Sequence, residues 1–335
     1  MFKKKRLIAE FEEQSFTQII FPHKDTDWVE YLDEAQICFI NIIKTIIQFQ
    51  KCLVVCHDQD SVKKHFQDDK NLFFVEYQTD DTWARDCSLL CVSEADEITL
   101  LDFTFNAWGN KFNATKDNAL SYNIQRCYSK PIQKVDFVLE GGAVESNAED
   151  TILTTSACMF NPNRNPQLNP TTITQKLKNY FGSKHILYLN HGYLAGDDTD
   201  SHIDTLARFI DKKTIMYVAC NDEDDEHYHQ LKLMEEELCM IAKERGLKLI
   251  ALPLPEAIYY EKERLPATYA NFLFVNGAVL VPLYGVKEDQ EALKIFQETF
   301  HDRKIVGVDS SVLIRQHGSL HCVTMNFAAG VNISC

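Results

Sequence analysis

The chain has 335 residues, of which 45% are hydrophobic and 25% are charged, proportions typical of a globular protein with a sizeable core. Its formal net charge of −15 argues against nucleic acid as a partner, because nucleic-acid binding needs a basic face; a negative balance suits small cations. No apolar run approaches the roughly 18 residues of a membrane span, and the basic start MFKKKR lacks the apolar core of a secretory signal. We therefore expect a cytoplasmic protein without a membrane partner, and a homodimer as the common default among oligomers.

The cysteines also bear on the compartment. There are eleven, an odd number, and no CxxC occurs. Cys52 and Cys56, like Cys87 and Cys91, lie four residues apart in strand-like segments, so the members of each pair would share a face and pack as small buried hydrophobes. With no metal-site spacing, the pattern predicts reduced thiols in a reducing compartment.

Strand and helix patterns alternate along the chain. Strand-like segments occur at residues 17–21, 51–56, 71–77, 98–105, 137–141, 151–156, 185–190, 214–219, 248–254, 271–276, 278–284 and 304–309. Helical patterns occur at residues 27–51, 171–182, 223–246 and 287–302, and Gly246 is placed as a helix C-cap. This alternation predicts an α/β or α+β architecture. Residues 161–170 are the strongest loop signal but too short for a linker, so one domain over residues 1–335 is expected.

Four short stretches carry side chains that can perform chemistry: DDTWARD, ending at Asp86, VLEGGAVES with Glu140, DSHIDT with His202 and Asp204, and GSLHCVT with Cys322. Each one alone has an ordinary structural explanation, such as an ion pair, a turn or a buried cysteine. Together they suit one target, the guanidinium group, which is planar, permanently cationic and matched by carboxylates in pairs. Attack on its carbon needs carboxylates at the rim, a thiolate over the face and an imidazole to protonate the departing amine.

These stretches resemble those of the guanidine-modifying (pentein) superfamily, and specifically the agmatine deiminase family. Residues 7–31, 102–112, 154–166, 192–209 and 264–285 are similar to further segments of that family, in the same order. The resemblance implies a five-fold pseudosymmetric α/β propeller, built from ββαβ-type modules around a central active site. It would explain how residues so far apart in the chain converge. It also implies a single catalytic domain without a cofactor or metal.

The resemblance assigns roles to the candidate residues. Cys322 would attack the guanidinium carbon and form a thiouronium intermediate, while His202 would protonate the leaving nitrogen and later activate water. Asp86 and Asp204 would hold the edges of the guanidinium, and Glu140 would hydrogen-bond to His202. The product would be N-carbamoylputrescine, which feeds putrescine and polyamine synthesis.

The acidic loop has a possible use as well, because agmatine carries an ammonium where arginine carries a carboxylate. Asp198 is the first candidate for this ammonium, Asp200 and Asp197 are weaker candidates, and Trp83 and Trp108 would flank the methylene chain. The thiolate is either paired with a protonated His202 or generated by the incoming guanidinium, and the carboxylates slightly favour the second route.

Departures from the family pattern leave the catalytic residue types intact. They comprise Cys87-Ser88 after the WARD segment and His317, Ser319 and Met325 around the cysteine, and they affect the expected substrate preference most. Alternatives within the superfamily are a bacterial-type peptidylarginine deiminase and a free-arginine deiminase. Outside it stand a non-catalytic binder of a polyamine-like cation and a zinc hydrolase using His202, Asp204, His321 and Cys322. The final segment, AAGVNISC, suggests no role.

Overall fold

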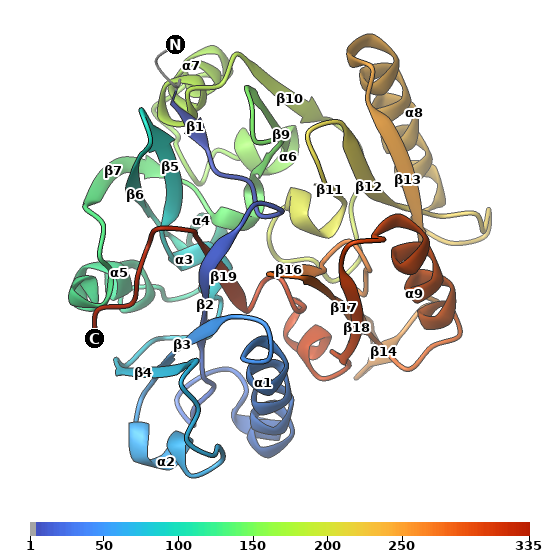
Figure 1. The fold of residues 1–335 in the computed structure, drawn as a ribbon. Helices are drawn as coiled ribbons and strands as arrows, with labels where there is room; N and C mark the ends of the chain where they lie inside the picture. Colours follow the sequence, from blue (N-terminus) through green and yellow to red (C-terminus); the bar gives the residue numbers. More distant parts are fainter. Residues whose placement is uncertain (1–4) are drawn as a thin grey trace.

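Five small sheets surround a common centre, with the longer helices on the outside (Figure 1). This computed structural model describes residues 5–335. Three of these sheets take their strands from one continuous part of the chain. The other two also take a strand from near one end: Arg6–Leu7 joins the sheet of residues 90–138, and Thr324–Ala328 joins the sheet of residues 14–76. The five-fold α/β propeller implied by the sequence resemblance is therefore confirmed.

Each sheet is one blade with the same internal order: the first strand runs antiparallel to the central strand, which pairs in parallel with the third. The first strands are β19 (Thr324–Ala328), β5 (Leu90–Glu94), β8 (Glu145–Ser146), β11 (Ala207–Phe209) and β16 (Leu273–Val275). The central strands are β2 (Gln14–Ile20), β6 (Glu97–Thr104), β9 (Thr151–Thr155), β12 (Thr214–Ala219) and β17 (Ala278–Leu283). The third strands are β3 (Lys51–Cys56), β7 (Ile132–Val138), β10 (His185–Leu189), β13 (Lys248–Pro253) and β18 (Lys304–Asp309).

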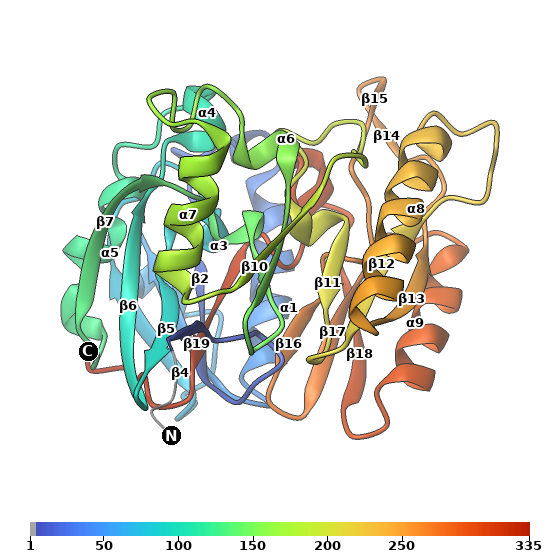
Figure 2. The ribbon, with the colours of Figure 1, turned by 90° about the horizontal axis from the view of Figure 1, so that it is seen from above.

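Helices form the crossover between the central and third strands, as a parallel connection requires. In blade order they are α1 (Leu32–Ile46), α5 (Leu120–Asn123), α7 (Pro170–Phe181), α8 (Tyr228–Arg245) and α9 (Glu288–Thr299). Figure 2 shows α7, α8 and α9 along the outer side of their sheets. The remaining elements are β1 (Arg6–Leu7), α2 (Gln59–Lys63), β4 (Leu72–Glu76), α3 (Ala84–Cys87), α4 (Ala107–Asn110), α6 (Ser156–Met159), β14 (Tyr259–Tyr260) and β15 (Glu263–Arg264), besides short 3-10 turns.

The ends of two helices show why the predicted helical segments form. The side chain of Asn169 caps α7 by accepting from the Thr172 amide, Pro170 occupies its first turn, and Gly182 ends it in the left-handed conformation. Gly246 ends α8 in the same way, with φ of 65°, as expected from the sequence. Helix α1 is shorter than predicted, because residues 29–31 form a 3-10 turn and the helix stops at Ile46.

The first blade closes the ring. Its first strand, β19, comes from the C-terminal part of the chain and pairs antiparallel with β2 near the N-terminus, which also pairs in parallel with β3. The aromatic rings of Phe16 in β2 and Phe327 in β19 stack on each other across this strand pair, with their centroids 4.4 Å apart. None of the helices within residues 5–335 has the length and apolar character needed to cross a membrane.

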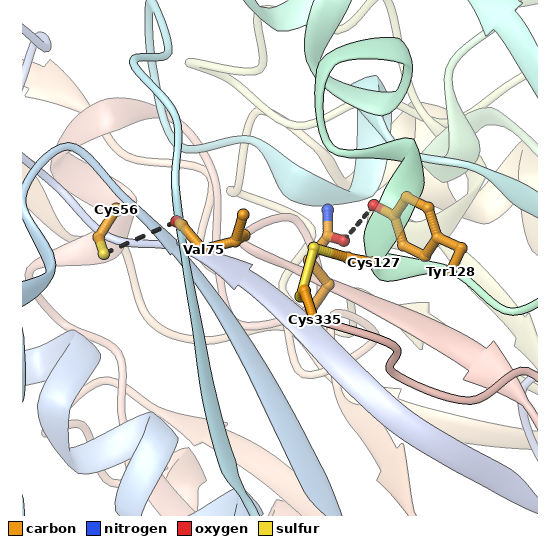
Figure 3. Close-up of a disulfide and its surroundings, with 6 residues drawn as sticks. Cys56, Val75, Cys127, Tyr128 and Cys335 are labelled. Atoms are coloured by element: carbon orange, nitrogen blue, oxygen red, sulfur yellow. Dashed lines mark hydrogen bonds between the residues drawn. A yellow bond between two sulfur atoms is a disulfide. The ribbon is translucent and has the colours of Figure 1, made fainter.

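The expectation that all cysteines are reduced is wrong for two of them. Cys127 and Cys335 form a disulfide that joins the C-terminal segment to the second blade (Figure 3). The Ser334 amide donates to the Cys127 carbonyl beside this bond, which holds the two segments side by side. The other nine cysteines are free. Cys87 is buried, as expected, but it ends α3 instead of lying in a strand with Cys91.

We predict that Cys335→Ser lowers the free energy of unfolding by about 2–4 kcal/mol in non-reducing buffer, because a cross-link between segments 208 residues apart restricts the unfolded chain. Denaturant unfolding with and without reductant measures this. The matched control is Cys239→Ser, which removes an exposed free thiol and leaves stability unchanged. Equal stability of wild-type and Cys335→Ser proteins without reductant would contradict the prediction.

Candidate active site

The site is built from the segments that precede the first strand of each blade. Four of these segments carry the predicted catalytic residues: Asp86 lies in α3 before β5, Glu140 before β8, His202 and Asp204 before β11, and Cys322 before β19. The fifth segment, before β16, carries Asn271, which the sequence analysis missed. Asn271 precedes its strand by two residues, as Cys322 does, and this shared register is the signal that would have identified it.

Gly142 brings three of the predicted residues together. A Cβ atom on this glycine would lie 2.7 Å from Nδ1 of His202, 2.9 Å from Oδ1 of Asp86 and 3.0 Å from Oδ2 of Asp204. The Gly142 amide also donates to Oδ1 of Asp86 at 2.9 Å. Glycine is therefore required here by close approach, since any side chain would displace at least one of these groups.

Cys322 lies against Asn271 and Asp204. Its Sγ is 3.3 Å from Nδ2 of Asn271 and 3.9 Å from Oδ2 of Asp204. Burial raises the pKa of the Cys322 thiol well above its ordinary value, and the charges of Asp204 and Asp86 raise it further. Without a cation in the site, Cys322 is therefore a thiol at neutral pH. This geometry supports the second route to the thiolate, in which the substrate generates it.

His202 is buried between carboxylates. Its Nδ1 lies 3.7 Å from Oδ1 of Asp86, its Nε2 lies 3.9 Å from Oε2 of Glu140, and neither ring nitrogen has a hydrogen-bond partner. Burial alone would lower the pKa of His202, but Asp86, Cys158 and Glu140 together raise it to about 10. His202 is thus an imidazolium at neutral pH, with donors available to a ligand.

Glu140 does not make the expected hydrogen bond to His202 at this distance. Both of its carboxylate oxygens instead accept from Nε of Arg164, at 2.9 and 3.0 Å. Arg164 also donates to Oδ2 of Asp200 and to the carbonyl of Thr199, so it ties Glu140 to the loop that carries His202. Arg164 comes from the loop at residues 161–170, in which the sequence analysis saw no function.

Glu140, Cys158 and His202 offer three metal-ligand atoms within 4.8 Å of one another, all of them buried. This spacing falls in the range that a transition metal spans. However, the guanidinium of Arg164 already occupies both oxygens of Glu140, so the carboxylate is engaged by a cation of the protein itself.

The two aspartates expected at the guanidinium rim are held differently. Asp86 accepts from the Gly142 amide on one oxygen and from Nε1 of Trp108, at 3.0 Å, on the other. Asp204 accepts from Nδ1 of His321 on Oδ2 at 2.7 Å, whereas its buried Oδ1 has no partner. Burial raises the pKa of Asp86; for Asp204 burial is outweighed, and the hydrogen bond and charge of His321 lower its pKa.

A cavity of about 400 Å³ leads to Cys322 and Asp86. Its walls include Trp83 and Trp108, whose rings meet edge to face with centroids 6.2 Å apart. Gly318 packs on Trp83 so closely that a Cβ would lie 2.2 Å from the ring. The carboxylates that line the cavity are all aspartates: Asp25, Asp27, Asp80, Asp81, Asp86, Asp117 and Asp198.

Asp81 is a cavity residue that the sequence analysis missed, although it lies inside the quoted stretch DDTWARD. Its carboxylate accepts from the indole N–H groups of Trp28, at 3.0 Å, and Trp83, at 3.1 Å, and so fixes one wall. Burial raises the pKa of Asp81 to about 7, and the neighbouring Asp27 contributes to this shift. A cation in the cavity would stabilise its charged form.

Of the acidic loop, Asp198 lines the cavity and Asp200 does not. Asp198 lies 4.0 Å from Nδ1 of His317 at the cavity wall, and burial raises its pKa. The oxygens of Asp200 are taken by Lys111 and Arg164, whose hydrogen bonds lower its pKa in spite of burial. Asp197 is also engaged locally, since it accepts from Thr199 and the Ser201 amide.

We predict that iodoacetamide alkylates Cys322 slowly at pH 7 and about tenfold faster for each added pH unit, because the thiolate fraction rises in that way below a raised pKa. Asp204→Asn removes one of the charges that raise this pKa and accelerates alkylation. Asp211→Asn, at an exposed position, is the charge-matched control. Mass spectrometry of the Cys322 peptide measures the rate, and a rate independent of pH between 7 and 9 would contradict the assignment.

We predict that Gly142→Ala reduces ammonia release from agmatine, the substrate expected from the sequence, by about 100-fold or more in kcat/KM, because the new methyl group displaces reacting groups by about 1 Å. The control is Gly277→Ala, whose Cβ meets nothing within 4 Å but whose φ of +74° costs about 1 kcal/mol of stability. It should keep full activity at a lower melting temperature. Full activity of Gly142→Ala would show that the geometry around this glycine is not the reactive one.

Comparison with known proteins identifies the family of this chain. The agmatine deiminase of C. jejuni with substrate bound is 44% identical, with a TM-score of 0.93 and coverage of 97% of both chains. A putative arginine deiminase of Porphyromonas gingivalis is 43% identical over 98% of this chain and 100% of its own, with a TM-score of 0.94. A putative agmatine deiminase of Vibrio parahaemolyticus is 31% identical over 96% of each chain. The sequence profile of the Porphyromonas-type peptidyl-arginine deiminases matches residues 6–327, and the chain belongs to this family.

Proposed function

We propose that this protein is an agmatine deiminase, which hydrolyses agmatine to N-carbamoylputrescine and ammonia. The observation that carries this proposal is the cavity above Cys322, which seven aspartates line. No lysine or arginine of the described chain lines it, so no permanently charged cation there matches the carboxylate of arginine. Agmatine has a guanidinium at one end and an ammonium at the other, and an acidic cavity complements both charges. The substrate-bound agmatine deiminase of C. jejuni, with 44% identity, supports the same substrate.

The positions of the side chains support the following first half of the reaction. The guanidinium lies with one edge on Oδ1 of Asp204, which has no partner in the structure, and another on Asp86. Its positive charge favours the thiolate of Cys322, so the thiol proton passes to solvent as the substrate enters. The sulfur lone pair then forms a bond to the central carbon. The His202 imidazolium gives its proton to the departing nitrogen, the carbon–nitrogen bond breaks, and ammonia leaves. A thiouronium on Cys322 remains.

The second half returns the enzyme to its starting state. His202, now neutral, takes a proton from water as the oxygen bonds to the thiouronium carbon. The carbon–sulfur bond then breaks with its electron pair returning to Cys322, and the sulfur takes the remaining hydroxyl proton as the carbonyl of the product forms, which regenerates the thiol. Throughout, Glu140 holds its negative charge near His202 and so favours the protonated form that starts the cycle.

The remaining substrate contacts are assigned by position. Asp198 binds the ammonium end, because it lines the cavity and its carboxylate is not engaged by a lysine or arginine side chain. Trp83 and Trp108 flank the methylene chain. Asp200 is not included, because its carboxylate binds Lys111 and Arg164.

The setting of the reaction is part of the proposal. Because each of the five blades supplies a residue to one site, residues 1–335 act as a single catalytic domain. The protein acts in the cytoplasm, a reducing compartment in which nine of its eleven cysteines remain free thiols. Its product feeds putrescine and polyamine synthesis. A homodimer, and the lack of a nucleic-acid partner, stay predictions.

Steady-state ammonia release from agmatine, free arginine and an arginyl peptide tests the proposal. We expect kcat/KM for agmatine to exceed that for either alternative by at least about tenfold, since an extra carboxylate or peptide in the acidic cavity meets repulsion or steric exclusion. Cys322→Ala, with no nucleophile, is the matched control and should release no ammonia while still binding agmatine. A tenfold preference for arginine or the peptide would replace agmatine as the substrate, and activity in Cys322→Ala would remove the covalent route.

A further inference from the structure

His321 lies buried between two carboxylates, directly before the proposed nucleophile. Its Nδ1 is 2.7 Å from Oδ2 of Asp204, and its Nε2 is 2.5 Å from Oε2 of Glu10. The side chain of His321 is 2% exposed, that of Asp204 is 1% exposed and that of Glu10 is 9% exposed. The mechanism above makes no use of this histidine.

The two contacts fix the charge of the ring. A carboxylate oxygen accepts hydrogen bonds, so each ring nitrogen that faces one must carry a proton. A neutral imidazole has one N–H and could satisfy only one of the two partners. His321 is therefore an imidazolium in this arrangement, and both of its hydrogen bonds are charge-assisted.

Glu10 anchors the far side of the ring. Its Oε2 also accepts from Nη2 of Arg208 at 2.8 Å, and its Oε1 accepts from the Phe274 amide at 2.9 Å. Burial opposes ionisation of Glu10, but His321, Arg208 and Arg85 lower its pKa far below the ordinary value. Glu10 is thus a fixed anion that leaves the imidazole little freedom to rotate.

The backbone holds His321 and Cys322 as one unit. The amide N–H groups of both residues donate to Oδ1 of Asn271, at 2.9 and 3.3 Å. The side chain of His321 then reaches Glu10, whereas Cys322 lines the substrate cavity. The side-chain amide of Asn271 therefore fixes both the sulfur of Cys322 and the imidazole of His321.

The hydrogen bond from Nδ1 of His321 gives the two carboxylate oxygens of Asp204 different roles. His321 occupies Oδ2, and Oδ1 is left buried without a partner. A buried carboxylate oxygen without a donor is costly, so this atom is prepared for an N–H group that arrives with the substrate. Rotation of the carboxylate would lose the hydrogen bond to His321.

We propose that His321 is a positioning residue, which clamps one oxygen of Asp204 and thereby presents the other to the guanidinium. This inference rests on the proposed function, because it assigns a cause to the binding geometry of that site. It gives the segment before β19 two tasks, since residue 322 attacks the substrate and residue 321 orients the carboxylate that holds it.

Two substitutions of His321 test its hydrogen bond to Asp204 and its hydrogen bond to Glu10 separately. The amide nitrogen of asparagine reaches about as far from the backbone as Nδ1 of histidine, and that of glutamine about as far as Nε2. His321→Asn therefore keeps a donor for Asp204 and loses Glu10, whereas His321→Gln keeps a donor for Glu10 and loses Asp204. Both variants lose the positive charge, so each is the control for the other.

Agmatine binding is measured by calorimetry in a Cys322→Ser background, and KM and kcat are measured with Cys322 present. We expect His321→Asn to bind agmatine within about threefold of the parent and His321→Gln to bind at least about tenfold more weakly. Because the guanidinium contact exists before and during the reaction, KM should rise more than kcat falls. Equal losses in the two variants, or a greater loss in His321→Asn, would overturn the inference.

A second measurement does not depend on the folding of either variant. The ¹⁵N and ¹H spectra of the histidine ring in the otherwise unaltered protein should show a proton on Nδ1 of His321, the nitrogen that faces Asp204, and a ring without that proton would overturn the clamp. Failure of the proposed function has a separate signature, since the wild-type protein would then release no ammonia from agmatine whatever the spectra show.

Discussion

The structure depends on one constraint: several carboxylates are buried together in a site from which water is largely excluded. Asp86, Glu140 and Asp204 are each at most 4% exposed and are contributed by three different blades. Burying carboxylates without partners would cost several kcal/mol each. Each one therefore has a donor within reach: the Gly142 amide and Trp108 for Asp86, Arg164 for Glu140 and His321 for Asp204.

Some buried polar atoms of the site still lack hydrogen-bond partners, and we propose that a cationic substrate supplies them. The ring nitrogens of His202 and Oδ1 of Asp204 are polar, buried and without partners, and all of them belong to the residues proposed to act on the guanidinium. Burial, and after it the charges of Asp204 and Asp86, raise the pKa of Cys322 and so favour its protonated form when no cation is bound. In the proposed mechanism, arrival of the guanidinium therefore compensates the buried carboxylates and favours the thiolate of Cys322 at the same time. This coupling protects a reactive thiol until the substrate is present.

The propeller explains how such a site holds its geometry. Five loops in equivalent positions meet at the axis, and each is anchored by the strand that follows it. The groups are then connected to one another by short contacts, through Gly142 on one side and Asn271 on the other. A displacement in one blade is resisted by contacts with the others. The site is therefore positioned by the ring as a whole.

Local signals in the sequence were sufficient for some features and not for others. The C-cap Gly246 of α8 was predicted because capping depends on neighbouring residues, and the core strands were recognisable from their apolar runs. The first strands of the blades are short and were mostly missed: β8 has two residues and β11 three. The five-fold arrangement came only from the family resemblance.

The residues of the site also divide into those with a recognisable signal in the sequence and those without one. Charged and nucleophilic candidates, such as Cys322 and His202, were found because their chemistry is specific. Asn271 carries no charge, and Arg164 pairs with Glu140 across 24 residues, so neither contact is visible in the spacing. Asp200 was a candidate on composition alone, and its partners Lys111 and Arg164 come from distant segments. The cross-link between Cys127 and Cys335 spans 208 residues, and no sequence pattern selects that pair among eleven cysteines.

The closure of the ring by β19 has a consequence for biosynthesis. Ribosomes translate a chain from its N-terminus, so the residues of the four later blades leave the exit tunnel before Cys322 and β19 do. Until then, β2 lacks its antiparallel neighbour and the site lacks its sulfur. Completion of the first sheet and arrival of the proposed nucleophile are a single event, so a chain that has not yet reached Cys322 cannot carry out the proposed reaction.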